Sequence, residues 1–515
     1  MTSSNENKMN HAQALQPYSI QRWLILVAVM LATLPIVLDM TILHIVVPRL
    51  TQAIGASTTE VLWIIDIYPL LMAGLLVPMG TLADRVGNWR ILQIGLMTFT
   101  LASVLAAYSP NATTLIVARA FLALGGAMIM PCVLGIICRN FEDEGERGVA
   151  LGLWSMVGAT GSAIGPLIGG FLLEHFWWGS VFLINVVVML VVAPICYFIL
   201  PRKEEATQGK WAFDQAIVFI IGIISVVYGI KTISTTQPTI FALLTLFVGV
   251  AMLTIFGREQ LRSSEAMLDL SLLSHPVIIA GITMTIVSMG VMAGVQLVLA
   301  QESLYVLDKT PLEAGIVMLP LMVGVGIGGA LGGFISKAFG LRMLAVSSLC
   351  ISACVLFILA RSDFGSSIIL VPAMLSILGL MLSASLTASS IAIMGSVETS
   401  KGGAAGSLEA TGFELGTGLG IAFFGVGISL LFKHTLKLPV GLNAEQTEQA
   451  SRSIGDAYLV ATQLTIEQGG MLIEASKQAF IATHTLLFSS AGVLLSILSI
   501  AVYILLGSSQ RNGKK

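Results

Sequence analysis

Long apolar runs recur along nearly the whole chain, and they constrain its fold more than any other feature. A helix needs about 18 or more apolar residues to cross a hydrocarbon core of about 30 Å. Only 10% of the 515 residues are charged, whereas a soluble domain carries about 25%. The pattern predicts an all-α bundle of about fourteen transmembrane helices rather than a soluble enzyme. The expected spans are 22–45, 60–81, 90–109, 112–137, 147–172, 178–200, 213–231, 238–257, 275–299, 311–336, 341–360, 366–394, 405–432 and 482–506.

The polar segment 1–21 precedes the first apolar run. It has neither the layout of a signal peptide nor an A-x-A-like cleavage site, so the run that begins at Trp23 is interpreted as the first membrane helix. An even number of spans places both termini on one side. With the N-terminus inside, the inner segments hold more Lys and Arg than the outer ones, which predicts that both termini are cytoplasmic.

A motif is repeated in degenerate form in the two halves of the chain. Residues 80–90 (GTLADRVGNWR) follow the second expected span, residues 333–342 (GFISKAFGLR) follow the tenth, and both segments carry glycines seven positions apart. Transporters are often built from such repeats. The repeat maps helices 9–14 onto helices 1–6 and predicts a 6 + 2 + 6 arrangement. The expected domains are an N-terminal segment 1–21, an N-terminal bundle 22–200, a linker with an inserted helix pair 201–262, a C-terminal bundle 263–506 and a tail 507–515.

One segment, 433–480, breaks the apolar pattern. It is rich in Glu, Gln, Ser and Ala and falls between the last two spans, on the outer side of the expected topology. Its stretches 444–454 and 461–478 suit short amphipathic helices, which could form a hairpin over the mouth of a transporter. A solvated linker fits the composition equally well.

Several motifs occur together in the order found in one known family. They are LDMTILHIVVP at 38–48, WIIDIY at 63–68, the loop at 80–90, Arg119 followed by GGA at 125–127, and GATGSAIGPLIGG at 158–170. In these features the chain resembles a major facilitator superfamily drug/proton antiporter of the fourteen-helix class. It is most similar to the QacA/SmvA group of quaternary ammonium and methyl viologen exporters, and within that group to the SmvA type.

The chain also departs from that family pattern. His44 stands where many relatives have Asn, and Asn88 and Trp89 replace a more basic pair. The segment 319–325 (LPLMVGV) lacks the carboxylate that the QacA type carries in its tenth helix. A substrate range like that of QacA, divalent cations in particular, is therefore not implied.

Ionisable side chains within the apolar spans are the first candidates for function, because each costs about 2.5–3.5 kcal/mol to insert. Five are expected there: Asp39, Asp66, Arg119, Glu409 and Glu414. Desolvation and a nearby Arg act in opposite directions on the pKa of a buried carboxylate, which can bring it into a range where it titrates during transport. Asp39 is therefore the predicted proton carrier, and Arg119 the residue that sets the balance between the two effects. A static pair that fixes the first helix against the fourth is the alternative.

The other three carboxylates are candidates for binding a cationic substrate. Asp66 is predicted to bind a cation or a proton, although a polar contact at a helix end is an alternative. Glu409 and Glu414 point about 140° apart on a helix, so one of them faces the cavity. Glu414 lies deeper and is the predicted drug partner, with Glu409 near the cytoplasmic entrance. The predicted aromatic and Met lining, for which packing or lipid contact is the alternative, is Trp63, Tyr68, Trp154, Met156, Met322 and Phe413.

Two glycine-containing motifs are predicted to serve structure and motion. Small residues in the fifth helix let neighbouring helices approach closely, and a proline bends it; these are Gly158, Gly161, Gly165, Pro166, Gly169 and Gly170. The loop motif is predicted to be a charge latch that breaks as the bundle rocks, so its loss would slow turnover without changing specificity. Its residues are Gly80, Asp84, Arg85, Gly87 and Arg90.

The sequence contains no signature of an enzyme. A P-loop, a nucleophile elbow and a metal-ligand spacing are all absent from it. The histidines His44, His175, His275 and His484 stand at expected helix ends and are interpreted as interfacial. No cofactor is expected beyond a proton gradient, and no nucleic-acid partner.

The resemblance implies proton-coupled export of lipophilic cations such as quaternary ammonium compounds, dyes, methyl viologen and biguanides. It implies a bacterial inner-membrane protein, which we expect to function as a monomer. A facilitator or importer of a small metabolite, or a receptor without transport activity, could share the scaffold. An importer of anions would need more than one intramembrane Arg or Lys, and only Arg119 is expected there.

Overall fold

The structure is a computed structural model that describes residues 3–141, 143–200, 213–235, 240–262, 267–268, 270–367, 369–397, 402–439 and 442–512. Every regular element in these residues is helical. The first part of the chain forms α1 (Ser3–Ile54), α2 (Thr58–Val86), α3 (Asn88–Ala107), α4 (Ala112–Asn140), α5 (Glu144–His175), α6 (Ser180–Ile199), α7 (Phe213–Thr235) and α8 (Ile240–Arg262). The second part forms η1 (Leu270–Ser274), α9 (Pro276–Gln301), a π-helical turn η2 (Glu302–Val306), α10 (Pro311–Phe339), α11 (Leu341–Leu359), α12 (Leu370–Met394), α13 (Gly402–Thr435), α14 (Ala444–Ala450), α15 (Ile454–Ala461) and α16 (Ile466–Asn512).

Thirteen of the described helices are long and apolar enough to cross a membrane. They coincide with thirteen of the fourteen spans expected from the sequence, so the prediction of a polytopic all-α membrane protein is confirmed. The remaining span, 147–172, lies within α5, a helix of 32 residues in which several side chains are outside the described part. A fourteenth crossing at α5 stays a prediction.

The repeated loop motif corresponds to repeated local geometry. Gly87 joins α2 to α3 at φ +104°, and Gly340 joins α10 to α11 at φ +86°. A residue with a Cβ would be strained at such φ values, so the second glycine of each motif is needed for the sharp junction. Ser57 begins α2 and Thr310 begins α10, each through a capping box. The same offset, 253 residues, separates both pairs (310 − 57 and 340 − 87).

Helix packing follows the same order in the two halves of the chain. In the first half α1 packs against α4, α5 and α6, α2 against α4, and α3 against α4 and α6. In the second half α9 packs against α12, α13 and α16, α10 against α12, and α11 against α12 and α16. The halves meet mainly where α5 contacts α10 and where α2 contacts α13, and the pair α7–α8 contacts α2 and α13 through α7.

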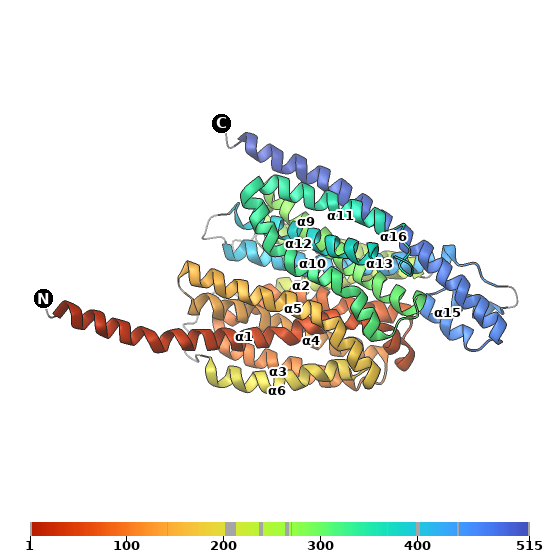
Figure 1. Cartoon of the computed structure of the whole chain (residues 1–515), viewed down its shortest axis with the longest axis horizontal. Helices are drawn as coiled ribbons and strands as arrows, with labels where there is room; N and C mark the ends of the chain where they lie inside the picture. Colours follow the sequence, from red (N-terminus) through yellow and green to blue (C-terminus); the bar gives the residue numbers. More distant parts are fainter. Residues whose placement is uncertain are drawn as a thin grey trace.

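Figure 1 shows the two halves as stacked groups of helices. The start of α1 and the end of α16 lie at one end of the molecule, and α15 lies at the other. The close contacts between the halves lie toward the α15 end. A Cβ on Gly170 of α5 would stand 2.5 Å from Leu312 Cα of α10, and one on Gly425 of α13 would stand 2.2 Å from a Leu62 methyl group of α2.

Segment 433–480 is folded onto the bundle and is not a solvated linker. Tyr458 of α15 donates a hydrogen bond to the Tyr305 carbonyl (2.5 Å), and Lys477 of α16 forms an ion pair with Asp308. Apolar side chains of this segment, including Ile454 and Val460, are fully buried. The expected helices 444–454 and 461–478 are correct only in part, because Ser453 caps a separate helix α15 and everything from Ile466 onward belongs to α16.

Candidate functional site

Asp39 of α1 and Arg119 of α4 form an ion pair in the core of the first half. The two residues are 4% and 1% exposed. Asn185 of α6 donates a second hydrogen bond to Asp39 Oδ1 (3.4 Å), and Arg119 Nε donates to the Ile64 carbonyl of α2 (3.1 Å). Both charged groups are therefore well partnered, and the cluster joins four helices.

Tyr68 of α2 extends this cluster toward the second half. Its ring lies beside the Arg119 guanidinium, 4.8 Å from centroid to Cζ, and is fully buried. A Cβ on Gly126 would stand 2.8 Å from the Tyr68 hydroxyl, so that glycine makes room for it. Among the described residues the hydroxyl has no hydrogen-bond partner. Asp39 and Glu414 both lie near enough to influence it electrostatically, so Tyr68 is close to an acid of each half.

Glu414 lies on the face of α13 that meets α2. Gly418, one turn further on, is so close to α2 that a Cβ there would stand 2.7 Å from a Leu70 methyl group. Glu414 Oε2 is buried and accepts no hydrogen bond from the described residues. Glu409 has another environment: it is 8% exposed and accepts a hydrogen bond from Ser390 of α12 (3.3 Å). The two carboxylates thus face different helices.

Asp66 is not part of the Asp39–Arg119 cluster. Positions 64 and 66 of α2 differ by about 200° around the helix, so when Ile64 faces Arg119, Asp66 faces away. Asp66 pairs instead with Lys231 of α7, Nζ to Oδ2 2.5 Å. Lys231 lies within the membrane span Phe213–Thr232, so the expectation that Arg119 is the sole intramembrane cation is wrong. The expected span ended at residue 231, so Lys231 stood at its last position and was not counted among the intramembrane charges.

A second buried pair was also missed from the sequence. His484 Nδ1 of α16 lies 2.7 Å from Glu302 Oε2 in η2, with both side chains under 5% exposed. Aromatic rings of Phe364 and Phe488 pack against the imidazole at 4.8 and 4.4 Å. The interpretation of His484 as interfacial is therefore wrong, because α16 begins at Ile466 and carries position 484 into the bundle.

The other histidines were expected at helix ends as well. His175 and His275 are exposed there, at the end of α5 and the start of α9. The side chain of His44 lies outside the described part of the chain.

Two members of the predicted aromatic and Met lining have contacts with other parts of the bundle. Trp63 packs over the Lys231 ammonium (4.4 Å), and Trp154 Nε1 donates to Thr33 Oγ1 of α1 (3.1 Å). The remaining members differ in exposure: Met322 is buried, Phe413 is half-buried and Met156 is 65% exposed.

The glycines of α5 allow close contact with two neighbouring helices. A Cβ on Gly165 would stand 2.0 Å from Thr41 Oγ1 of α1, and Gly161 and Gly169 face the same helix. A Cβ on Gly315 of α10 would stand 2.7 Å from the Pro166 carbonyl oxygen. Gly158 has nothing within 4 Å of its added Cβ, so the pattern begins at Gly161.

The loop motif forms a contact within the first half. Asp84 at the end of α2 pairs with Arg139 at the end of α4 (3.2 Å), and both side chains are exposed. Arg85 and Arg90 are exposed as well, and Gly80 lies against Pro131 of α4. The motif therefore ties α2 to α4 and makes the turn at Gly87.

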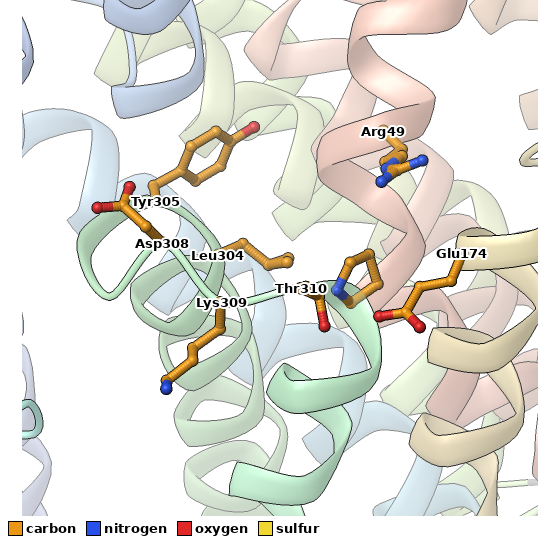
Figure 2. Close-up of a pocket in the computed structure, with 8 residues that line it drawn as sticks. Arg49, Glu174, Leu304, Tyr305, Asp308, Lys309 and Thr310 are labelled. Carbon is orange, nitrogen blue, oxygen red and sulfur yellow. The ribbon is translucent and has the colours of Figure 1, made fainter.

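Two cavities of the surface involve none of the predicted substrate residues. One, of 460 Å³, lies where the halves meet at the α15 end (Figure 2). In it Glu174 of α5 points toward the start of α10, where the Leu312 amide donates to its carboxylate (3.4 Å), and Arg49 Nη1 donates to the Leu173 carbonyl (3.1 Å). The other, of 430 Å³, is an apolar groove between α7, α13 and α16. Within the described residues no group of three His, Cys, Asp or Glu could hold a metal ion.

The arrangement of two helical halves around buried charges defines a membrane transporter. Residues 29–421 match the family model of the Major Facilitator Superfamily, and the chain belongs to that family. It is 40% identical over 492 residues to the methyl viologen resistance protein SmvA of Salmonella typhimurium, covering 95% of this chain and 99% of that protein. It is 33% identical to the multidrug efflux pump LfrA of Mycolicibacterium smegmatis, covering 89% and 91%. These matches confirm the family expected from the sequence and its SmvA-type neighbourhood.

Solved structures support the fold. A bacterial homolog of the human lysosomal transporter Spinster, in an inward-facing and unoccupied conformation, superposes with a TM-score of 0.68 at 18% identity, covering 94% of this chain and 97% of that one. The peptide-transporter structure PepTSo2 gives a TM-score of 0.59 at 12% identity, covering 95% and 99%.

Proposed function

We propose that this protein is a proton-coupled antiporter that exports lipophilic cations from the cytoplasm. The observation that carries the proposal is the pair of buried acids, Asp39 in the first half and Glu414 in the second, which both lie near Tyr68 where α2 meets α13. Acids facing one another across two mobile halves can bind a proton and a cation in alternation. The names of the relatives, a methyl viologen resistance protein and a multidrug efflux pump, point to the same class of substrate.

The proposed architecture is 6 + 2 + 6. It is supported by the packing order, in which each contact among α1–α6 has a counterpart among α9–α13 and α16. The contacts between the halves follow the same correspondence. Helix α5 maps onto α13 and α10 onto α2, so the α5–α10 contact has the α13–α2 contact as its counterpart. The inserted pair is α7–α8, and the domain limits proposed from the sequence, 22–200, 201–262 and 263–506, separate these groups.

The proposed proton step begins at Asp39. A proton on this carboxylate cancels the charge that holds Arg119, and the guanidinium also contacts Ile64 and Tyr68 of α2. Protonation therefore weakens a contact that joins α1 and α4 to the helix at the interface between halves. Such a change in one buried pair can bias the equilibrium between two packed arrangements.

The proposed drug partner is Glu414, because a carboxylate without a protein donor can balance the charge of a bound cation. Trp63, Tyr68, Trp154, Met156, Met322 and Phe413 remain the proposed apolar lining, and Glu409 the carboxylate near the entrance. The lining residues that already have structural partners, Trp63 and Trp154, contribute by supporting the site.

The proposed orientation places both termini in the cytoplasm. The start of α1 and the end of α16 lie at the same end of the molecule, which agrees with an even number of crossings (Figure 1). In that orientation the halves are in close contact at the outer end, and the conformation is inward-facing. The Asp84–Arg139 pair at the inner end is the proposed latch within the first half.

A facilitator or importer of an anionic metabolite is the competing function. Two intramembrane cations, Arg119 and Lys231, satisfy the sequence criterion for it. Each of them is paired with a buried Asp, however, so neither offers an uncompensated positive charge to an anion. The partnering of both cations favours cation export.

The test follows a fluorescent lipophilic cation and lumenal pH together in inverted vesicles that contain the protein. Drug added to acid-inside vesicles should release protons from the lumen, and Asp39→Asn should abolish this release. Asp363→Asn, at an exposed loop carboxylate remote from both acids, is the matched control and should behave like the parent. Proton release that is absent in the parent, or unchanged in Asp39→Asn, would refute the proposal.

A further inference from the structure

A buried charge pair between α2 and the inserted helix α7 lies outside the Asp39–Arg119 cluster. Lys231 Nζ is 2.5 Å from Asp66 Oδ2, with the side chains 1% and 0% exposed. The same ammonium stands 4.4 Å from the centroid of the Trp63 ring, and the Tyr228 ring packs against Trp63 at 6.3 Å. Lys231 is thus held by a carboxylate and an aromatic face at once.

A carboxylate beside an aromatic face is the combination that binds organic ammonium ions. We propose that Asp66, Trp63 and Tyr228 form a cation-binding site for alkylammonium groups, which Lys231 occupies in this conformation as a tethered ligand. The ammonium of Lys231 ends a flexible four-carbon chain, so it can leave the site without unfolding α7. An arriving cation that displaces it keeps the charge of Asp66 balanced.

A purely structural ion pair accounts less well for these contacts. Desolvation offsets most of the attraction in a buried pair, so such a pair adds little net stability. Asp66 Oδ1 is buried without a hydrogen-bond partner among the described residues, whereas Asp39 is engaged by both Arg119 and Asn185. Asp66 therefore has an acceptor available for a further donor, which a carboxylate built only to hold Lys231 would not need.

The position of the site gives the inserted helix pair a role. Helix α7 contacts both α2 and α13, the helices through which the two halves meet. A residue of α7 that competes with cations for an acid of α2 would set how strongly that acid binds them. That a transported drug uses the site rests on the proposed function, but the binding of an alkylammonium ion does not.

The experiment supplies the missing ammonium to Lys231→Ala as a free ion. The purified full-length protein is titrated with n-propylammonium chloride, with n-propanol as the uncharged control, and Tm is measured. A ligand of this size binds at about 1–10 mM, so saturation should raise Tm of Lys231→Ala by about 1–3 °C. The parent should show a smaller rise than Lys231→Ala, because Lys231 competes for the site. Asp66→Asn/Lys231→Ala should show no rise.

Three outcomes overturn the proposal: no shift in Lys231→Ala, an equal shift in the double variant, or an equal shift with n-propanol. If Lys231→Ala does not fold alone, it is purified with n-propylammonium or n-propanol present throughout. Recovery of monodisperse protein with the ammonium only supports the proposal, and no recovery with either overturns it. Because the readout is binding without a proton gradient, failure here leaves the export proposal standing, and failure of proton release in vesicles leaves this one standing.

Discussion

The two halves of the molecule each carry a buried acid, and the two acids differ in their hydrogen-bond partners. Asp39 in the first half is bound by Arg119 and Asn185, while Glu414 in the second half has a buried oxygen without a donor among the described residues. Tyr68 lies near both acids. A partnered acid changes the structure when it takes up a proton, because its partners must rearrange. An acid without a partner is instead receptive to an incoming cation.

This difference in partners predicts different changes in the free energy of unfolding when a charge is removed from each site. Deleting one member of a buried ion pair leaves an uncompensated charge, which typically destabilises a protein by about 3–5 kcal/mol. Deleting the charge of a carboxylate without donors removes a desolvation penalty instead. Stability measurements therefore distinguish a structural acid from a binding acid, while transport measurements alone do not.

The largest effect is expected for Arg119→Met. The substitution leaves the charge of Asp39 buried without its cation, and we expect a loss of about 3–5 kcal/mol in the free energy of unfolding. The loss is measured as a lowered Tm of the purified protein. Asp39→Asn/Arg119→Met is the control and should recover most of it, because neither charge remains. A double variant no more stable than Arg119→Met would show that Arg119 acts through packing alone.

Gly165→Ala tests how tightly the first-half acid is enclosed. Its Cβ would lie 2.0 Å from Thr41 Oγ1, two residues from Asp39, so α5 and α1 must separate. We expect a loss of about 1–3 kcal/mol in the free energy of unfolding, together with slower transport. The matched variant beside the second-half acid is Gly412→Ala, whose Cβ would make an ordinary 3.5 Å contact with Thr285. Equal Tm values for the two variants would remove the contrast in packing between the halves.

Glu414→Gln should separate binding from stability in the second half. The side chain keeps its volume and loses its charge, so we expect cation affinity to fall tenfold to a hundredfold, a change of about 1.4–2.7 kcal/mol. Tm should stay the same or rise, because no donor loses its acceptor. Glu409→Gln, which keeps an acceptor for Ser390, is the control and should bind cations more nearly like the parent. A Tm loss in Glu414→Gln comparable to that of Arg119→Met would contradict the assignment of Glu414 as a binding acid.

Helix positions and one of the charge clusters could be predicted from the sequence. Apolar run length located thirteen spans because the bilayer fixes the length of a crossing helix. Asp39 and Arg119 could be paired because two opposite charges buried in neighbouring helices must neutralise one another. The packing of Gly161, Gly165 and Gly169 against α1 also follows from a spacing of four residues, which places them on one face of a helix.

The partners of the remaining charges depend on how helices are rotated and where they end. The sequence places Asp66 within an apolar span but does not give the rotation of α2, which turns Asp66 toward Lys231 of α7. Lys231 and Glu302 lay at or beyond the expected ends of their spans, and π-helical η2 extends the ninth span by five residues to Val306. His484 shows the same limit, since α16 begins at Ile466, ahead of its expected start at residue 482, and packs there against α15.

The smallest effect on stability is expected for Asp84→Asn, which extends the comparison to charges in water. The Asp84 and Arg139 side chains are 57% and 40% exposed, and a surface pair contributes about 0–1 kcal/mol, so Tm should hardly change. If the pair is a latch between α2 and α4, the turnover rate should fall while the KM for the cation stays constant. Asp363→Asn is the control: hydrogen bonds from Ser366 and the Gly365 amide hold the pKa of that exposed carboxyl below its usual range, yet it joins no two helices. A parental rate for Asp84→Asn would show that the repeated loop motif serves the turn at Gly87 alone. A raised KM would place Asp84 on the path of the substrate.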